Sequence, residues 1–233
     1  MEFQMRNKTL ISSMVGVAAA VAVAGSANAG VTIDSFTNST LTQDRSSFGS
    51  IFNSREDGNN GTSALPTINT ATNRLEVNTG AELGSVTTFW QNFEANGDVG
   101  PFIDLSQLST ITFDVTSQAA SVITFVIQQR TGDLYSSGSA GSVRWTNVAV
   151  GAGSSSVTLT VGQNSGGVWS VSGIGTAALS NVSYMSMRLG TTGAGAVGFV
   201  GSIGNLQYNL VPAPGAFALL GAAGLVGARR RRA

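Results

Sequence analysis

Alternating apolar and polar residues recur along the middle of this chain, and this pattern constrains the fold more than any other feature. In one clear example, Val157, Leu159 and Val161 alternate with threonines, and residues 110–115 repeat the pattern. A period of two places successive side chains on opposite faces of a strand, whereas few stretches have helical periodicity. The pattern therefore predicts a chain built from short strands.

The predicted strands are separated by clusters of Gly, Ser, Asn and Thr, which are typical of turns. They cover residues 31–36, 74–78, 85–93, 110–115, 121–128, 143–150, 157–161, 181–189, 197–201 and 203–210. About ten short strands with polar connections favour an all-β fold, an antiparallel β-sandwich, and we expect a jelly-roll-like one.

Two segments of this region carry more specific predictions. Residues 121–128 are apolar at nearly every position, which predicts a central strand covered on both faces. Residues 45–66 lack strand periodicity, so we expect a long surface loop there, with residues 57–61 as a turn.

Residues 1–29 have the features of a secretory signal peptide. A basic start precedes an apolar stretch, and small residues follow. The A-x-A pattern of Ala27 and Ala29 predicts cleavage by signal peptidase before Gly30. We therefore expect an exported domain over residues 30–210, preceded by a signal helix.

Residues 211–233 form a tail with three parts: a proline-containing turn, an apolar run and a basic end. Its motif residues are Val211, Pro212, Ala213, Pro214, Gly215, Arg229, Arg230, Arg231 and Arg232. A helix over the apolar residues 216–228 would be only ~20 Å long, short of the ~30 Å hydrocarbon core of a bilayer. The arginines favour the cytoplasmic side, so the preceding domain would lie outside the cytoplasm.

This tail resembles the PEP-CTERM sorting signal of Gram-negative and related bacteria. In that family an exosortase-type membrane protease removes the tail and delivers the protein to the cell surface or exopolysaccharide matrix. The resemblance implies transient membrane insertion and a location in the cell envelope, at the cell surface or in the extracellular matrix. Ala213 departs from the family pattern, which most often has Glu there. The alternative is an ordinary C-terminal membrane tail.

The composition of the predicted domain excludes several classes of function. Because the signal peptide holds one acid and two bases and the tail four arginines, residues 30–210 hold 11 acids and 6 arginines, a net charge of −5. This charge repels phosphate backbones, so we expect no nucleic-acid binding. The domain has no His, Cys or Lys, which excludes Ser-His-Asp and Cys-His catalysis, Schiff-base chemistry and His or Cys zinc sites.

Carboxylate chemistry remains open, because glycoside hydrolysis needs only two carboxyl groups. The candidates are Glu76, Glu82, Glu94 and Asp98. None belongs to a paired motif, and Glu76 alternates with Leu75 and Val77 as a solvent-facing residue would. We therefore expect a protein that is not an enzyme, with a glycosidase or polysaccharide lyase as the alternative.

Aromatic residues give a stronger indication of function than the acids do. Trp90, Trp145, Trp169 and Tyr135 are candidates for stacking on sugar rings. Trp169 is the first choice because the polar residues 163–167 lead into it, and the alternative for each tryptophan is a place in the core. Because six arginines offer few cationic contacts, we expect such binding to resist salt.

A structural calcium ion would need clustered oxygen ligands. Asp34, Asp98 and Asp104 could supply them only if the fold brings them together. The segment from Asp57 to Asn60 lacks the spacing of a calcium loop. We expect no other cofactor.

The segment Asp104-Leu105-Ser106, followed by residues 108–115, resembles a passage common in carbohydrate-binding jelly rolls and galactose-binding-like domains. Together with the two termini, it predicts an exported surface or matrix protein with a structural role or an association with exopolysaccharide.

Overall fold

The computed structural model describes the central domain of the chain. The described residues are 30–37, 52, 54–60, 65–79, 84–92, 100–131, 138–192 and 196–211, with the backbone alone for 54–60. The predicted signal peptide, the tail beyond Val211, and the candidates Glu82, Glu94, Asp98 and Tyr135 lie outside these residues. Within them, no helix has the length and apolar character needed to cross a membrane.

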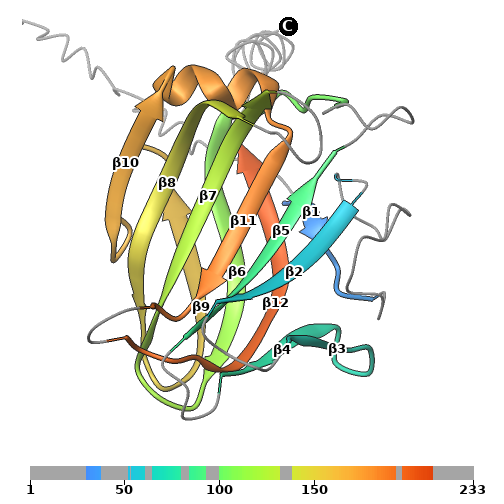
Figure 1. Cartoon of the computed structure of the whole chain (residues 1–233), viewed down its shortest axis with the longest axis vertical. Helices are drawn as coiled ribbons and strands as arrows, with labels where there is room; N and C mark the ends of the chain where they lie inside the picture. Colours follow the sequence, from blue (N-terminus) through green and yellow to red (C-terminus); the bar gives the residue numbers. More distant parts are fainter. Residues whose placement is uncertain are drawn as a thin grey trace, which may run out of the picture.

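The domain consists of two six-stranded sheets that pack face to face (Figure 1). Sheet A has the order β3-β4-β12-β6-β9, with β1 also paired to β12; its strands are β1 (Val31–Asp34), β3 (Thr67–Asn69), β4 (Arg74–Asn78), β6 (Leu108–Ser117), β9 (Gly153–Thr160) and β12 (Val200–Leu210). Sheet B has the order β10-β8-β7-β11-β5-β2; its strands are β2 (Ser54–Asn60), β5 (Ser85–Gln91), β7 (Ser121–Thr131), β8 (Gly138–Val150), β10 (Val168–Gly173) and β11 (Tyr184–Leu189). Neighbouring strands are antiparallel, which confirms the predicted jelly-roll-like β-sandwich.

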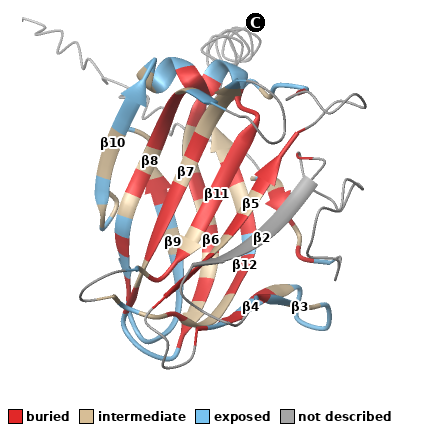
Figure 2. Ribbon diagram, in the orientation of Figure 1, coloured by how far each residue is buried: buried red, intermediate tan, exposed pale blue. Residues whose placement is uncertain are grey.

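The core lies between the sheets and follows the predicted strand phase (Figure 2). Phe113 on β6 and Phe125 on β7 are buried, as is Leu159 on β9. Their chain neighbours Thr112 and Thr158 point away from the core and keep exposed surface. Burying one face of each strand supplies most of the hydrophobic stabilisation, since apolar burial contributes ~25 cal/mol per Å².

The short 3₁₀ helix η1 (Gly175–Asn181) closes one end of the sandwich between β10 and β11. It buries Ala178 and Leu179, and the backbone N–H of Leu105 donates to the Leu179 carbonyl over 2.7 Å. The predicted strand over residues 181–189 therefore begins only at Tyr184.

Residues 54–60 correct the prediction of a loop over residues 45–66. They form β2, which pairs in register with β5 from Ser54 opposite Gln91 to Asn60 opposite Ser85. Apolar alternation could not reveal this strand, because an edge strand is held by backbone hydrogen bonds and tolerates charged residues. The turn predicted at residues 57–61 is wrong for the same reason, since residues 57–60 belong to β2.

Strand β7 corrects a second prediction in part. It is central in sheet B, between β8 and β11, as expected. Its inner residues Ile123, Phe125 and Ile127 are fully buried, but the outer residues Val122 and Val126 are only half-buried. The outer side of this strand therefore belongs to a partly accessible surface.

Candidate functional site

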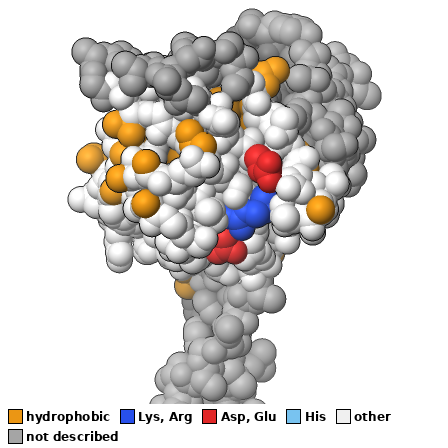
Figure 3. All heavy atoms as spheres, turned by 90° about the horizontal axis from the view of Figure 1, so that it is seen from below, with side chains coloured by type: hydrophobic (Ala, Val, Ile, Leu, Met, Phe, Trp, Pro, Cys, Tyr) orange, Lys and Arg blue, Asp and Glu red, His pale blue; other side chains and the backbone are white. Residues whose placement is uncertain are grey.

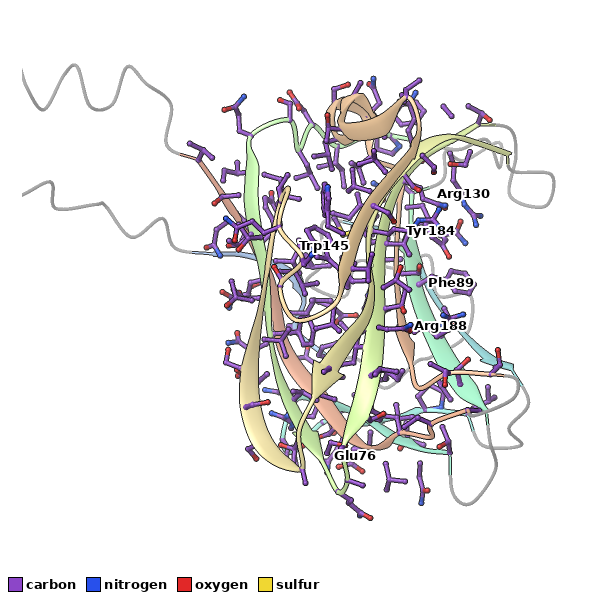
Figure 4. The ribbon with its side chains drawn as sticks, turned by 90° about the vertical axis from the view of Figure 1, so that its left-hand side faces the viewer. Glu76, Phe89, Arg130, Trp145, Tyr184 and Arg188 are labelled. Carbon is purple, nitrogen blue, oxygen red and sulfur yellow. The ribbon has the colours of Figure 1, made fainter. Side chains whose placement is uncertain are left out.

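The outer side of sheet B carries three of the domain's six arginines together with aromatic and hydroxyl side chains. The register places on this side Thr87, Phe89 and Gln91 of β5, Thr124, Val126, Gln128 and Arg130 of β7, Ser142, Arg144 and Thr146 of β8, and Tyr184, Ser186 and Arg188 of β11. We call this set the arginine face. In Figure 4, Arg130, Tyr184, Phe89 and Arg188 follow one another along it, whereas Trp145 points between the sheets.

A β-bulge shapes the arginine face between β7 and β8. The register shifts where Thr124 lies opposite both Thr146 and Asn147. Asn147 has a φ of 54°, and its N–H, displaced from the ladder, donates to the Thr124 hydroxyl over 3.2 Å. A bulge twists a strand and re-aims its side chains, and here it lies directly after the Arg144–Thr146 segment. Thr124 therefore satisfies the displaced amide and fixes the local path of β8.

An aromatic pair with an arginine beside it occupies one end of the arginine face. The rings of Phe89 and Tyr184 stack with centroids 5.8 Å apart and an interplanar angle of 28°. The guanidinium carbon of Arg130 lies 3.9 Å from the Tyr184 ring centroid, and Arg130 Nη1 donates to Gln91 Oε1 over 3.2 Å. These contacts fix three large side chains while Phe89 keeps accessible surface.

Two adjoining hollows lie across the middle of the same face. The first has a volume of about 280 Å³ and is lined by Thr87, Thr124, Val126, Arg144, Thr146, Ser186 and Arg188. The second has a volume of about 490 Å³ and is lined by Val122, Thr146, Asn147, Arg188, Thr191, Thr192 and Val197. Because they share Thr146 and Arg188, we describe them as one groove. Hydroxyl groups dominate its lining, with two guanidinium groups and a few valines between them.

The two arginines of the groove have few hydrogen bonds of their own. Arg144 Nη2 donates to the Ser142 hydroxyl over 2.9 Å, and that hydroxyl also pairs with Ser172 over 2.8 Å. The Nε atoms of Arg144 and Arg188 are both buried without a hydrogen-bond partner. Unpaired buried donors are uncommon in native proteins, and the other unpartnered buried side-chain atoms of the described residues are Ser85 Oγ and Gln129 Oε1.

The tryptophan predictions need correction for two of the three rings. Trp90 and Trp145 are fully buried, and a ring without accessible surface cannot stack on a sugar. Trp90 Nε1 donates to the Asp34 carboxylate over 2.7 Å, while Trp145 Nε1 donates to the Thr160 and Gln163 carbonyls. Both rings therefore stabilise the core.

Trp169 is half-buried and packs edge-to-face on Trp145, with ring centroids 4.7 Å apart. It approaches from the inner side of sheet B and so lies on the opposite side from the arginine face. Its role as a ligand contact stays a prediction.

The described carboxylates lie away from the groove. Asp34 is fully buried and accepts hydrogen bonds from Trp90 and from the Phe36 N–H over 2.7 Å. Glu76 is exposed on β4, as its alternation predicted, and accepts from Asn69 over 2.7 Å. Asp104 accepts from the Ser106 N–H over 2.9 Å, and this bond lowers the Asp104 pKa. Within the described part of the chain, no three acidic residues gather as metal ligands.

The residues of the arginine face were not predicted from the sequence. Arg144 and Arg188 occupy outward positions of strands that were predicted, so strand phase could have placed each on a surface. A second signal was available, because arginines within strands stand out in a domain without lysine. Alternation alone, however, does not say that β8, β7, β11 and β5 are neighbours.

Comparisons with known proteins find two similar solved structures. No protein-family model matches the chain, and no curated protein sequence is similar to it. One structure is a family 11 carbohydrate-binding module from Clostridium thermocellum in complex with a β-1,3-1,4-mixed-linked tetrasaccharide; the match has 12% identity and a TM-score of 0.36 and covers 66% of this chain and 81% of that one. The other is the family 11 module of the cellulosomal cellulase Lic26A-Cel5E of the same organism, with 10% identity, a TM-score of 0.37, and coverage of 75% and 96%. At these TM-scores the similarity carries no argument about a ligand.

Proposed function

We propose that this protein binds a polysaccharide along the groove of the arginine face and holds it without catalysing a reaction. The observation that carries the proposal is that the Phe89–Tyr184 stack lies beside a hydroxyl-lined groove on one sheet, because Phe89 pairs with the groove residue Ser186. Sites for small ligands are concave, with a few placed polar groups beside aromatic surface. A sugar chain offers the complementary chemistry, since its hydroxyls form hydrogen bonds and its C–H faces pack on aromatic rings.

The position of the described carboxylates favours binding in the groove over hydrolysis. Hydrolysis of a glycosidic bond requires two carboxyl groups roughly 5 to 10 Å apart across the bond. None of the acids whose side chains are described lines the groove. The protein therefore holds its polysaccharide, as a structural or matrix-associated component would.

The proposal is tested with a glycan array and the full-length purified protein. Phe89→Ala should weaken binding by about 0.5–1.5 kcal/mol, because it removes an aromatic contact. Thr158→Ala, on the exposed side of sheet A, serves as the control and should bind like the parent protein. Equal binding by the Phe89 variant would contradict this location of the site. Shortened glycan chains after incubation would favour the enzyme alternative instead.

Delivery to the cell surface is the second part of the proposal and rests on the sequence of the two termini. The signal peptide would be removed before Gly30, and an exosortase-type protease would remove the tail that contains Arg229 to Arg232. Intact-mass spectrometry of the protein from its native host tests both steps. A surface form that still carries the arginines would contradict sorting by tail removal.

A further inference from the structure

The arginines of the domain are distributed unevenly over its two sheets. Residues 30–210 contain six arginines and no lysine, and three of the arginines lie on the arginine face. The acids whose side chains are described are Asp34, Glu76, Asp104 and Asp114. Three of these belong to strands of sheet A, and Asp104 precedes β6, so none of the four is on sheet B. The domain has a net negative charge, yet its groove is lined by two arginines and by none of the acids whose side chains are described.

Arg188 is the central residue of the groove, because both hollows include it. No side-chain hydrogen bond or ion pair involves Arg188 within the described part of the chain, and its Nε is buried without a partner. Burying a donor without a partner destabilises a fold, and the cost is greater for charged groups. Because Arg188 lines both hollows, a ligand in the groove that accepts hydrogen bonds can contact the accessible part of its side chain.

The strand register places no acid directly beside either groove arginine. The row through Arg188 reads Gly58, Thr87, Arg188 and Thr124 across β2, β5, β11 and β7. Glu56 of β2 lies in the row of Arg144, but four strand spacings away. At ~4.8 Å per spacing this is about 19 Å, too far for an ion pair. The strand positions directly beside the two groove arginines therefore hold no acid.

From these contacts we propose that the polysaccharide bound in the groove is anionic and that its oxyanion pairs with Arg188 and Arg144. This inference rests on the proposed function and names the class of its ligand. A guanidinium group binds a carboxylate through two parallel hydrogen bonds, which a neutral sugar cannot accept in the same way. Thr87, Thr146 and Ser186 then bind the sugar hydroxyls around the charged group. The carboxylate of a uronic acid and a sulfate ester share this oxyanion chemistry.

Isothermal titration calorimetry of the full-length protein tests the inference with matched ligands. The ligands are tetragalacturonate, its methyl ester, cellotetraose and dextran sulfate. Tetragalacturonate should bind about 10- to 100-fold more tightly than its methyl ester, as expected for the loss of a hydrogen bond between charged groups. Its affinity should fall as ionic strength rises. Tighter binding of dextran sulfate than of tetragalacturonate would assign the oxyanion to a sulfate ester and equally support the inference.

Three variants locate the effect. Arg188→Met should abolish the preference for the charged tetramer, and Arg188→Lys should keep part of it because the charge stays while the planar fork is lost. Arg74→Met changes the net charge equally but on sheet A, and it should leave the preference intact. Equal affinity for tetragalacturonate and its methyl ester would overturn the anionic ligand, while binding of either would still support a glycan site. Failure of every glycan to bind would overturn both proposals.

Discussion

Two arginines on the outer sides of the two sheets have opposite surroundings. Arg74 of sheet A donates from Nε to the Ser202 hydroxyl over 2.7 Å, and from Nη2 to the Ser202 carbonyl over 3.2 Å and the Thr116 hydroxyl over 3.3 Å. Arg188 of sheet B lines the groove with a buried Nε that has no partner. The side chain of the first arginine ties three strands together, whereas the side chain of the second contributes no hydrogen bond to the described fold.

Acids lie close to the arginine of sheet A as well. Figure 3 shows basic atoms between two groups of acidic atoms on the face seen from below. Asp114 lines the same hollows as Arg74. An arginine side chain in this domain can thus find several hydrogen-bond acceptors, as Arg74 does. The missing partner of Arg188 Nε therefore reflects its position in the groove.

The largest effect is expected inside sheet B, where the inner and outer sides of one sheet can be compared. Trp145→Ala should reduce the free energy of unfolding by about 3–5 kcal/mol, because it empties a fully buried site. Phe89→Ala, on the outer side of the same sheet, should cost about 1 kcal/mol, of the size of an aromatic pair contact. Urea denaturation measures both values. Similar losses for the two variants would mean that the outer aromatic pair belongs to the core.

Sheet A offers the next largest contrast, between adjacent residues of β9. Leu159→Ala should cost about 2–5 kcal/mol, since Leu159 is fully buried. Thr158→Ala should change the free energy of unfolding by no more than about 0.5 kcal/mol, because its side chain faces solvent. Equal losses of stability at the two positions in chemical denaturation would show that the assignment of inward and outward residues on β9 is wrong.

A smaller loss is expected for Arg74→Met. The substitution leaves the Ser202 and Thr116 acceptors without their guanidinium partner. Hydrogen bonds to charged groups contribute about 1.5–3 kcal/mol when buried, and Arg74 is only half-buried, so we expect about 1 kcal/mol. The thermal midpoint at constant pH provides the measurement. No change in the midpoint would show that the hydrogen bonds of Arg74 do not hold the strands together.

The fold was largely predictable from the sequence because its core strands alternate. β4 has the predicted bounds, and the inner residues Phe113 and Leu159 are buried as expected. Short edge strands escaped the prediction, because β2 and β3 are held by backbone pairing and carry little apolar signal. The segments predicted at residues 197–201 and 203–210 merge into β12, which begins at Val200.

The candidate site was far less predictable than the fold. The expectation of salt-resistant binding assumed that six arginines are too few to matter, but three of them converge on one face. That convergence depends on β11 lying beside β7, two strands that are more than fifty residues apart in the chain. Local periodicity carries no information about such pairing. It also gave no sign of the bulge at Asn147 that shapes the groove.

The central difference is that Arg188 binds a ligand, whereas Arg74 stabilises the fold. The most direct test measures the free energy of unfolding and the affinity for tetragalacturonate on the same preparation of Arg188→Met. The account predicts an unfolding free energy within about 0.5 kcal/mol of the parent protein, or slightly higher, because a buried unpaired donor is removed. It predicts an affinity that is lower by about 10-fold or more. A stability loss as large as that of Arg74→Met, with unchanged affinity, would contradict the account.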